Sequence, residues 1–321
     1  MWSRSRSPLR YPGSKSRFAS FIAQALRLNG LREPLLVEPF CGGASVSIAL
    51  LEAGIVSGIA VNDAEPVIAA FWDAVFDVES AKWLAEQVRT VPLTLEEWDR
   101  QKSLVTDDTR QAALRCLYLN RTSFNGMLQA RAGPIGGRTQ QNRKLDARFN
   151  REALALRILE LTKLRDRVVA VDGDHWLAFT ARFYDEPNVV FYFDPPFYHK
   201  AERLYERWFD ENEHRRLHHA VRALTKPWLL SYDDAPEVRK LYDKLPLRSR
   251  AIDSTYSTHP VGGGSFVGRE LFYTNLRCLP AAHPVDADHE GLTVLKGRVG
   301  PKAGEGPLRR PHSAPATLCP D

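Results

Sequence analysis

The sequence contains no run of about 18 apolar residues, so it predicts no transmembrane helix. Its first residues also lack the apolar stretch of a signal peptide. The four cysteines, Cys41, Cys116, Cys278 and Cys319, are far apart and form no C-x-x-C pair. This spacing argues against a zinc site or a disulfide framework and is typical of a protein of the reducing cytoplasm.

Signatures of several nucleotide enzymes are missing as well. The chain has no G-x-G-x-x-G fingerprint, and the segment Tyr11 to Lys15 lacks the first glycine and the preceding strand of a P-loop. The nine histidines show no metal-ligand spacing, and we expect His214, His218 and His219 to face solvent from one helix. The sequence therefore offers no metal centre and no candidate site for hydride transfer.

Basic charge is unevenly distributed along the chain. The net charge is +5, yet residues 110–151 contain nine Arg or Lys and a single acid, Asp146. The first 17 residues add five basic side chains and no acid. Because a solvated helix face normally mixes signs, these one-signed stretches favour contacts to the phosphates and base edges of nucleic acid over an incidental basic surface.

The first part of the chain follows a strand–helix–strand order. We predict a strand over Leu35–Glu38, a bend over Pro39–Gly43, a helix over residues 44–53 and a second strand over residues 57–61 that ends at Asp63. A strand, a glycine-containing bend, a helix and a strand with a terminal acid form half of a dinucleotide-style α/β fold.

The rest of the chain completes this α/β pattern after a long interruption. Nearly unbroken helices are predicted from about residue 65 to 120, followed by a basic hairpin or ordered loop with turn signals such as Asn125-Gly126. Strands return around residues 168–171, 188–193, 228–232, 247–253 and 269–275, the last of them antiparallel to its neighbour. We therefore divide the chain into a catalytic part over 1–72, a helical and basic target-recognition insertion over 73–165, a second catalytic part over 166–278 and a disordered tail over 279–321.

One loop concentrates the chemistry. Asn188 to Phe193 is an apolar, β-branched run typical of a buried parallel strand, and Asp194-Pro195-Pro196-Phe197 follows it directly. Ligands of open α/β sheets bind at the carboxyl ends of the strands. Asp194 and a free carbonyl are two acceptors beside an aromatic ring, which suits the exocyclic NH2 of a stacked base. A strand end with a turn and a core phenylalanine is the alternative interpretation.

A second group of residues could hold a nucleoside. Gly42-Gly43 lets the backbone approach a ligand at a helix N-terminus, and Asp63 lies where an acid binds ribose hydroxyls. Asp172 and Asp174 end a further strand and could add a contact. A helix N-cap for Asp63 and a structural turn for Asp172 and Asp174 remain open.

Five motifs taken in order resemble the Dam-like DNA adenine-N6 methyltransferases. They are Tyr-Pro-Gly-Ser-Lys15, Phe-Cys-Gly-Gly43, Asn-Asp63, Asn-Arg-Thr-Ser-Phe-Asn-Gly126 and Asp-Pro-Pro-Phe197. The likeness runs from about Leu9 to Asn275. It implies a Rossmann-like class I methyltransferase sheet, mostly parallel with the last strand antiparallel, and a mostly helical DNA-recognition insertion. The chain departs from the family at Phe197, where tyrosine is usual, and at Ser14, where glycine is commoner.

The resemblance also implies roles for individual residues. The catalytic set is Asp194, Pro195, Pro196 and Phe197. S-adenosylmethionine is the implied cofactor, held by Tyr11, Gly13, Lys15, Phe40, Cys41, Gly42, Gly43, Asp63 and Asp174. The implied DNA contacts are Asn120, Arg121, Asn125, Arg131, Arg138 and Arg143.

The expected activity is methyl transfer to N6 of an adenine flipped out of double-stranded DNA, by a cytoplasmic enzyme without a metal. A companion restriction endonuclease is possible for such an enzyme and cannot be detected from this sequence. The alternatives are the same fold acting on cytosine N4 or on an RNA base, because their NH2 groups meet the same acceptors, and a DNA-binding scaffold without turnover.

Overall fold

The fold is described from a computed structural model of the chain. It describes residues 7–10, 15–128, 132–141, 144–199, 209–256, 266–281 and 292–293. The predicted site residues Tyr11, Gly13, Arg131 and Arg143 lie outside these ranges, as does nearly all of the predicted disordered tail.

A twisted sheet forms the centre of the molecule. Its strands lie in the order β3-β2-β1-β4-β5-β7-β6-β8. The first five are parallel, β7 is antiparallel to both β5 and β6, and β8 is antiparallel to β6. The predicted fold class, including the antiparallel final strand of the catalytic part, is confirmed. The strands span β1 Leu35–Glu38, β2 Gly58–Asn62, β3 Val168–Asp172, β4 Val189–Phe193, β5 Trp228–Asp233, β6 Arg248–Tyr256, β7 Phe266–Thr274 and β8 Leu292–Thr293.

Alternating side chains of the central strands pack into two separate cores. On β4, Val190 and Tyr192 join the core under α1 and α2, whereas Phe191 and Phe193 join the core under α8, α10 and α11. Both faces of the parallel part are therefore covered, which explains why β4 is apolar at every position rather than at every second one. The covering helices are α1 (Ala19–Leu28), α2 (Ser45–Glu52), α8 (Trp176–Ala181), α10 (Glu211–Ala223) and α11 (Pro236–Tyr242).

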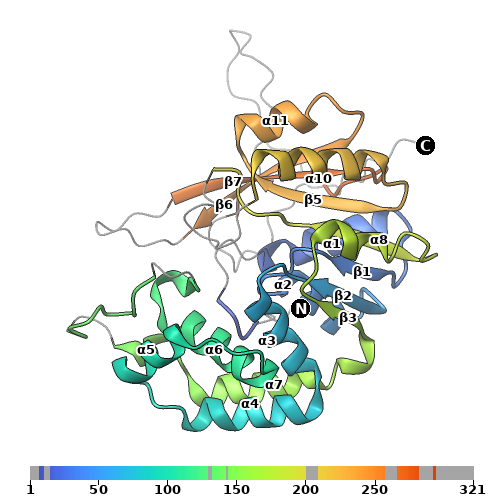
Figure 1. Ribbon diagram of the computed structural model, residues 1–321. Helices are drawn as coiled ribbons and strands as arrows, with labels where there is room; N and C mark the ends of the chain where they lie inside the picture. The colour runs from blue at the N-terminus through green and yellow to red at the C-terminus, as the bar shows by residue number, and fades with distance from the viewer. Residues whose placement is uncertain are drawn as a thin grey trace, which may run out of the picture.

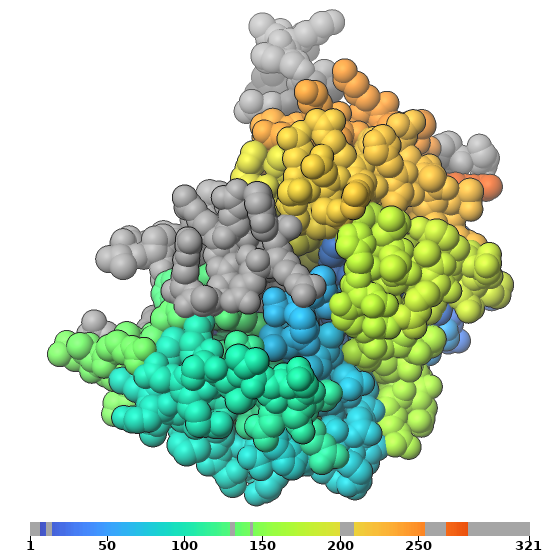
Figure 2. Space-filling model, viewed as in Figure 1, coloured from blue at the N-terminus to red at the C-terminus, as the bar shows by residue number. Residues whose placement is uncertain are grey.

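Five further helices pack together beside the sheet (Figure 1). In Figure 2 they form one side of the molecule, and α10 and α11 lie on the opposite side. They are α3 (Pro66–Phe76), α4 (Val78–Thr90), α5 (Leu95–Ser103), α6 (Thr109–Thr122) and α7 (Arg151–Thr162). Single 3-10 turns occur at Ser16–Phe18, Phe124–Gly126, Leu145–Arg148 and Arg165–Arg167.

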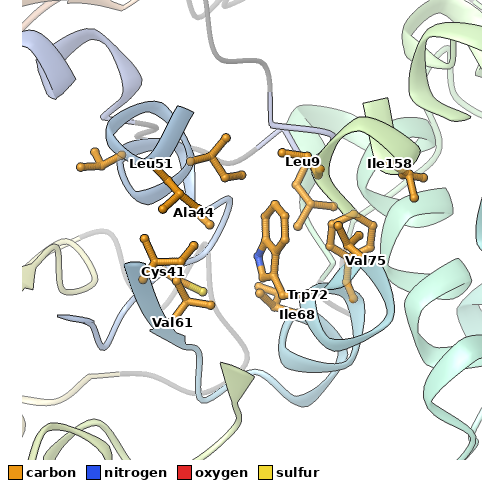
Figure 3. Close-up of a cluster of buried hydrophobic side chains, with 14 of the residues drawn as sticks. Leu9, Cys41, Ala44, Leu51, Val61, Ile68, Trp72, Val75 and Ile158 are labelled. Atoms are coloured by element: carbon orange, nitrogen blue, oxygen red, sulfur yellow. The ribbon is translucent and has the colours of Figure 1, made fainter. Parts of the chain in front are cut away.

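Trp72 of α3 connects these helices to the catalytic part. Its ring lies between Ala44, just before α2, and Ile158 of α7 (Figure 3). Its Nε1 donates to the carbonyl of Gly42 at 2.8 Å. The five helices α3 to α7, called the helical part below, therefore stabilise the glycine bend that was expected to hold the cofactor. The predicted boundary at residue 72 falls inside α3, and the division into domains stays a prediction.

The structure also bears on what the sequence led us to expect of the histidines, the cysteines and membrane-spanning helices. His214 and His218 are only 1% and 8% exposed, so the prediction that they face solvent is wrong: His214 packs against Tyr232 of β5 and His218 against Tyr242 of α11. His219 is exposed, as predicted. Cys41 and Cys116 are buried free thiols, while Cys278 is disulfide-bonded. Within the described ranges, no helix is both long and apolar enough to cross a membrane.

Candidate active site

The predicted site residues gather at the carboxyl ends of the parallel strands. The sheet order reverses between β1 and β4, so the loops after these strands diverge and leave room for a ligand. Phe40 to Gly43 follow β1, Asp63 follows β2 and Asp194 follows β4. The structure thus brings the candidate cofactor bend and the candidate catalytic loop to one edge of the sheet.

Asp194 is held by two donors that meet the same oxygen. Lys15 Nζ lies 3.1 Å from Asp194 Oδ1, and Ser231 Oγ donates to Oδ1 at 2.7 Å. Both of these contacts are made to Oδ1. Burial raises the pKa of Asp194, while Lys15 and the hydrogen bond from Ser231 act in the opposite direction. Two fixed donors therefore orient the carboxylate and leave its second oxygen for a further partner.

A buried hydroxyl relay lies behind this carboxylate. Tyr192 Oη is 2.8 Å from Ser231 Oγ, and neither side chain is exposed. Because the Ser231 hydroxyl gives its one hydrogen to Asp194, it accepts from Tyr192. The order of donation is then Tyr192 to Ser231 to Asp194. Lys15 also lies 3.6 Å from Glu270 Oε1, so one ammonium is shared by two carboxylates.

The loop after Asp194 presents a partly accessible ring. Pro195 is buried, and Pro196 and Phe197 are half-buried. Lys15 Nζ lies 5.4 Å from the centre of the Phe197 ring, within the range of a cation–π contact. Lys15 thus touches both the carboxylate and the aromatic ring of the predicted catalytic set.

The bend after β1 is fixed by backbone and side-chain bonds. Gly42 has a positive φ of +44°, and its N–H donates to Asp63 Oδ2 at 2.8 Å. The N–H of Cys41 donates to the carbonyl of Asn62 at 2.9 Å. Gly43 is buried beside them, and the Phe40 ring is half-buried. Four predicted cofactor residues therefore form one ordered turn tied to the end of β2.

Asp63 has a structural role, although the N-cap of α3 is Glu65 and not Asp63 as the sequence had left open, and it retains capacity for a ligand. Its two oxygens accept from the N–H groups of Gly42 and Glu65, at 2.8 and 3.0 Å. A carboxylate has about four lone-pair sites, so both oxygens can accept further hydrogen bonds. Burial raises the pKa of Asp63 to about 6, against the lowering effect of these two backbone bonds.

Asp174 is less directed toward the bend. Its side chain is 54% exposed and lies 3.8 Å from Arg182, which also pairs with Asp172. Its backbone carbonyl accepts from Asn62 Nδ2 at 3.1 Å, and the same amide donates to the Pro39 carbonyl at 3.0 Å. Asn62 therefore ties the end of β3 to the bend, while the Asp174 carboxylate remains on the surface.

Asn120 and Arg121, two of the predicted DNA contacts, hold the N-terminal segment. The Asn120 side chain is 1% exposed, accepts from Arg10 N at 2.6 Å and donates to the carbonyls of Arg10 and Gly126, both at 2.9 Å. Arg121 Nε donates to the Pro8 carbonyl at 2.6 Å. Gly126 has φ +72°, and a Cβ there would lie 2.5 Å from the Arg10 carbonyl. We therefore assign the motif that ends at Gly126 a structural role, in which it docks the segment leading to Lys15.

Other residues of the basic segment are accessible. Asn125 is exposed in the left-handed region at φ +54°, and the neighbouring Phe124 is 54% exposed. Arg138 is exposed, forms a bidentate pair with Asp99 at 2.7 Å for both bonds, and lies over the ring of Trp98. These contacts orient Arg138 without burying it.

Three arginines meet where the N-terminal segment joins the helical part. Burial, Arg10 and Arg148 together lower the pKa of Arg121 to about 10, and burial and Arg148 lower the pKa of Arg10. The positive charges of the two one-signed stretches of the sequence are thus close enough to repel each other.

The sequence-based interpretation missed several residues of this site. Glu38, at the end of β1, accepts from the Ser47 hydroxyl and is 3% exposed; burial raises its pKa to about 8. An acidic residue at the end of an apolar strand, directly before Pro39, was an available signal for it. Ser231 and Glu270 gave weaker signals, since their approach to Asp194 and Lys15 depends on the register of β4, β5 and β7.

Two further features bear on what the site could bind. No three His, Cys, Asp or Glu of the described ranges are grouped so that they could hold a metal ion. A groove of about 720 Å³ lies in the helical part and is lined by none of the predicted site residues. Its lining includes both basic and acidic side chains. It is lined by Leu93, Gln140, Lys144, Leu145, Asp146, Phe149, Asn150, Arg151 and Glu152.

Comparisons with known proteins identify the family of the chain. Residues 11–257 match the model of the D12 class N6 adenine-specific DNA methyltransferase family. None of the curated proteins compared with the chain matches it significantly. Among solved structures, the chain is similar to a candidate RNA methyltransferase from Pyrococcus horikoshii, with 10% identity, 83% of this chain and 85% of that chain covered, and a TM-score of 0.38. The rRNA methyltransferase aviRa from Streptomyces viridochromogenes gives 14% identity, 82% and 85% coverage, and a TM-score of 0.37.

Proposed function

The chain belongs to the D12 class N6 adenine-specific DNA methyltransferase family, and from that premise we propose that Asp194, Pro195 and Phe197 hold the adenine that it methylates. The observation that carries this assignment is the orientation of Asp194. Its Oδ1 is occupied by Lys15 and Ser231, and Oδ2 is left for the substrate.

The target adenine leaves the duplex and stacks on Phe197, at a cost of a few kcal/mol for unstacking and unpairing. One N6 hydrogen donates to Asp194 Oδ2 and the other to the Pro195 carbonyl. These bonds draw the N6 lone pair out of ring conjugation and direct it at the methyl group. Positioning and fixed electrostatics then supply most of the acceleration.

Charge balance on N6 assigns Asp194 a second task. When the N6 lone pair forms the new N–C bond, the bond between the methyl carbon and the sulfonium sulfur breaks and leaves its electron pair on sulfur. N6 then carries a positive charge and must lose a proton. Asp194 Oδ2 already accepts a hydrogen bond from N6, so it is the nearest base for that proton. The raised pKa of Asp194 favours this transfer, and Lys15 keeps the carboxylate ionised beforehand.

S-adenosylmethionine fits the residues at the strand ends, and when bound it supplies a methyl group on a sulfonium. Lys15 pairs with both Asp194 and Glu270, and Asp63 adds a third acid at this edge of the sheet, a balance that favours a cationic ligand. Asp63 is placed to accept from ribose hydroxyls, and the half-buried Phe40 ring offers a stacking face. Cys41, Gly42 and Gly43 let the chain approach closely, and we propose Tyr11, Gly13 and Asp174 as further contacts.

Double-stranded DNA is the proposed partner of the helical and basic insertion, predicted over residues 73–165. Phe124, Asn125 and Arg138 are the accessible contacts, with Arg131 and Arg143 as further candidates on the same basic segment. Arg10, Arg121 and Arg148 support a phosphate position next to the segment that leads to Lys15. We place the enzyme in the cytoplasm with its DNA substrate, as one member of a restriction–modification pair or as a solitary enzyme.

Transfer of labelled methyl groups tests the proposed function. The full chain is incubated with labelled S-adenosylmethionine and, separately, unmethylated double-stranded DNA and RNA, and each product is digested to nucleosides. We expect label in N6-methyladenine from DNA. Label in N4-methylcytosine or in an RNA nucleoside would overturn the acceptor, and cofactor binding without any transfer would support the silent-scaffold alternative.

A further inference from the structure

The first turn of α10 contacts the loop that follows Phe197. His214 lies in this turn, and its ring stacks on Tyr198 with 4.4 Å between ring centres and 25° between planes. Tyr198 directly follows Phe197, and its N–H donates to Asp233 Oδ1 at 3.1 Å. The residue after the proposed base-stacking ring is therefore held from two sides, by a strand end through its backbone and by α10 through its ring.

His214 is itself fixed by its surroundings. Its Nδ1 lies 2.6 Å from Tyr232 Oη, and the Phe209 ring packs edge-on against it at 4.8 Å and 78°. It is 1% exposed, and burial lowers its pKa, which favours the neutral ring. A neutral, immobile ring is a suitable support for the flat face of Tyr198.

The same turn also reaches the candidate cofactor bend. Glu213 Oε2 accepts from Trp176 Nε1 at 2.8 Å. The rings of Trp176 and Phe209 pack on Phe40 at 5.9 and 5.4 Å between centres. The beginning of α10 therefore contacts the Phe197 loop directly and is linked to the cofactor bend through Trp176, and methyl transfer is proposed to occur between these two loops.

We propose that His214 is a positioning residue for methyl transfer: its ring, stacked on Tyr198, fixes the loop so that Phe197 and Asp194 meet the target base together. The inference rests on the proposed roles of Phe197 and Asp194. His214 acts through Tyr198 and touches neither the base nor the reacting atoms. The effect can be large, because a displacement of about 1 Å can cost about 100-fold in rate.

A purely structural role is the competing explanation, and α10 contains a matched control for it. His218 lies one turn further along the same helix and is 8% exposed. It packs on Tyr242 of α11 at 5.2 Å, and among the described residues it has no contact with Tyr198. Each histidine has one buried ring nitrogen without a hydrogen-bond partner in the described ranges, so the two sites also match in this respect.

The test compares His214→Leu, His214→Phe and His218→Leu in the full chain. For each variant, thermal unfolding, kcat, and KM for DNA and for S-adenosylmethionine are measured. We expect His214→Leu to lower kcat by about tenfold or more, within the range of small displacements, with KM for the cofactor unchanged. His214→Phe keeps a ring to stack on Tyr198 and should stay within about threefold of wild type. His218→Leu should lose comparable thermal stability and keep its kcat.

Three results would overturn the role of His214. They are an unchanged kcat in His214→Leu, an equal loss of kcat in His218→Leu, and a His214→Phe variant as slow as His214→Leu. Failure of the proposed function looks different: a wild-type chain that does not methylate adenine contradicts that function, whereas an active wild type with an equally active His214→Leu contradicts only the positioning role.

Discussion

Phe197 occupies the position where the family resemblance leads one to expect tyrosine. The ring keeps its stacking face, and Lys15 approaches it to 5.4 Å. The hydroxyl that tyrosine would add is absent, so in the proposed mechanism we expect Asp194 and its relay to contribute more to positioning the base. Sequence alone could identify Asp194 and Phe197, since both follow one apolar strand. It could not identify Ser231 or Tyr192 as partners of Asp194, because that contact depends on how β4 and β5 align.

Glu38 provides a residue-scale prediction about pH and stability. Its pKa is about 8 in the folded chain, against about 4.5 for an unperturbed glutamate. The folded state therefore keeps a proton that the unfolded chain has released between these values, and the stability from the neutral carboxyl is lost as pH rises through this window. Glu38→Gln mimics the neutral form. We expect it to become progressively more stable than wild type from pH 5.5 to pH 8, by up to about 1.4 kcal/mol per pH unit.

Urea unfolding at several pH values measures this difference. Glu79→Gln, at an exposed acid on α4, is the control and should run parallel to wild type. Parallel curves for Glu38→Gln and wild type would show that Glu38 ionises normally in the folded chain.

At the scale of elements, the sequence predicted where the parallel strands lie and where they end, because each is an apolar run followed by an acidic residue. The Asn120–Gly126 motif was also recognised, but its role was not predictable from sequence. A motif inside a basic segment suggested DNA, whereas the Asn120 amide bonds the backbone of Arg10, 110 residues away in the chain. The same lack of long-range information hid the burial of two histidines of α10: His214 packs against Tyr198 and Tyr232, and His218 packs against Tyr242 of α11.

Gly126→Ala tests the docking role of this motif. The change forces an L side chain into φ +72° and places its Cβ 2.5 Å from the Arg10 carbonyl. We expect a loss of unfolding free energy of about 1–2 kcal/mol from the backbone conformation, and more from displacing the Arg10 segment. Gly137→Ala is the control, because Gly137 has φ +65° and open space around its Cβ position.

Urea unfolding and cofactor titration together measure the two effects. Since Lys15 follows the displaced segment, Gly126→Ala should weaken cofactor binding and Gly137→Ala should not. Equal losses in the two variants would mean that the contact with Arg10 contributes nothing beyond the glycine conformation.

At the scale of the whole molecule, the helical part and α10 lie on opposite sides (Figure 2). The sequence indicated the segment that interrupts the α/β pattern, because its residues 110–151 are almost all basic where charged, whereas a solvated helix normally carries charges of both signs. It could not show that Trp72 joins this part to the Gly42 bend, since that bond spans 30 residues. DNA held by the helical part would therefore lie against the elements that carry the cofactor bend.

Arg138 tests this arrangement through the salt dependence of DNA binding. If it exchanges Asp99 for a phosphate, Arg138→Ala should weaken binding to all sequences and reduce the slope of log K against log salt by about 0.9. Asp99→Asn should bind at least as tightly as wild type, because it frees the guanidinium. Arg215→Ala removes a similarly paired, exposed arginine from α10 and is the control. An unchanged slope in Arg138→Ala would place Arg138 outside the interface.

The most direct measurement for the whole account is N6-methyladenine formed in a single turnover by Asp194→Asn. The variant keeps the size of the side chain and loses the carboxylate that accepts from N6 and takes its proton. We expect no detectable N6-methyladenine, with DNA and cofactor binding close to wild type, while Asp172→Asn at the end of β3 remains active. Normal N6-methyladenine formation by Asp194→Asn would contradict the assignment of the catalytic loop.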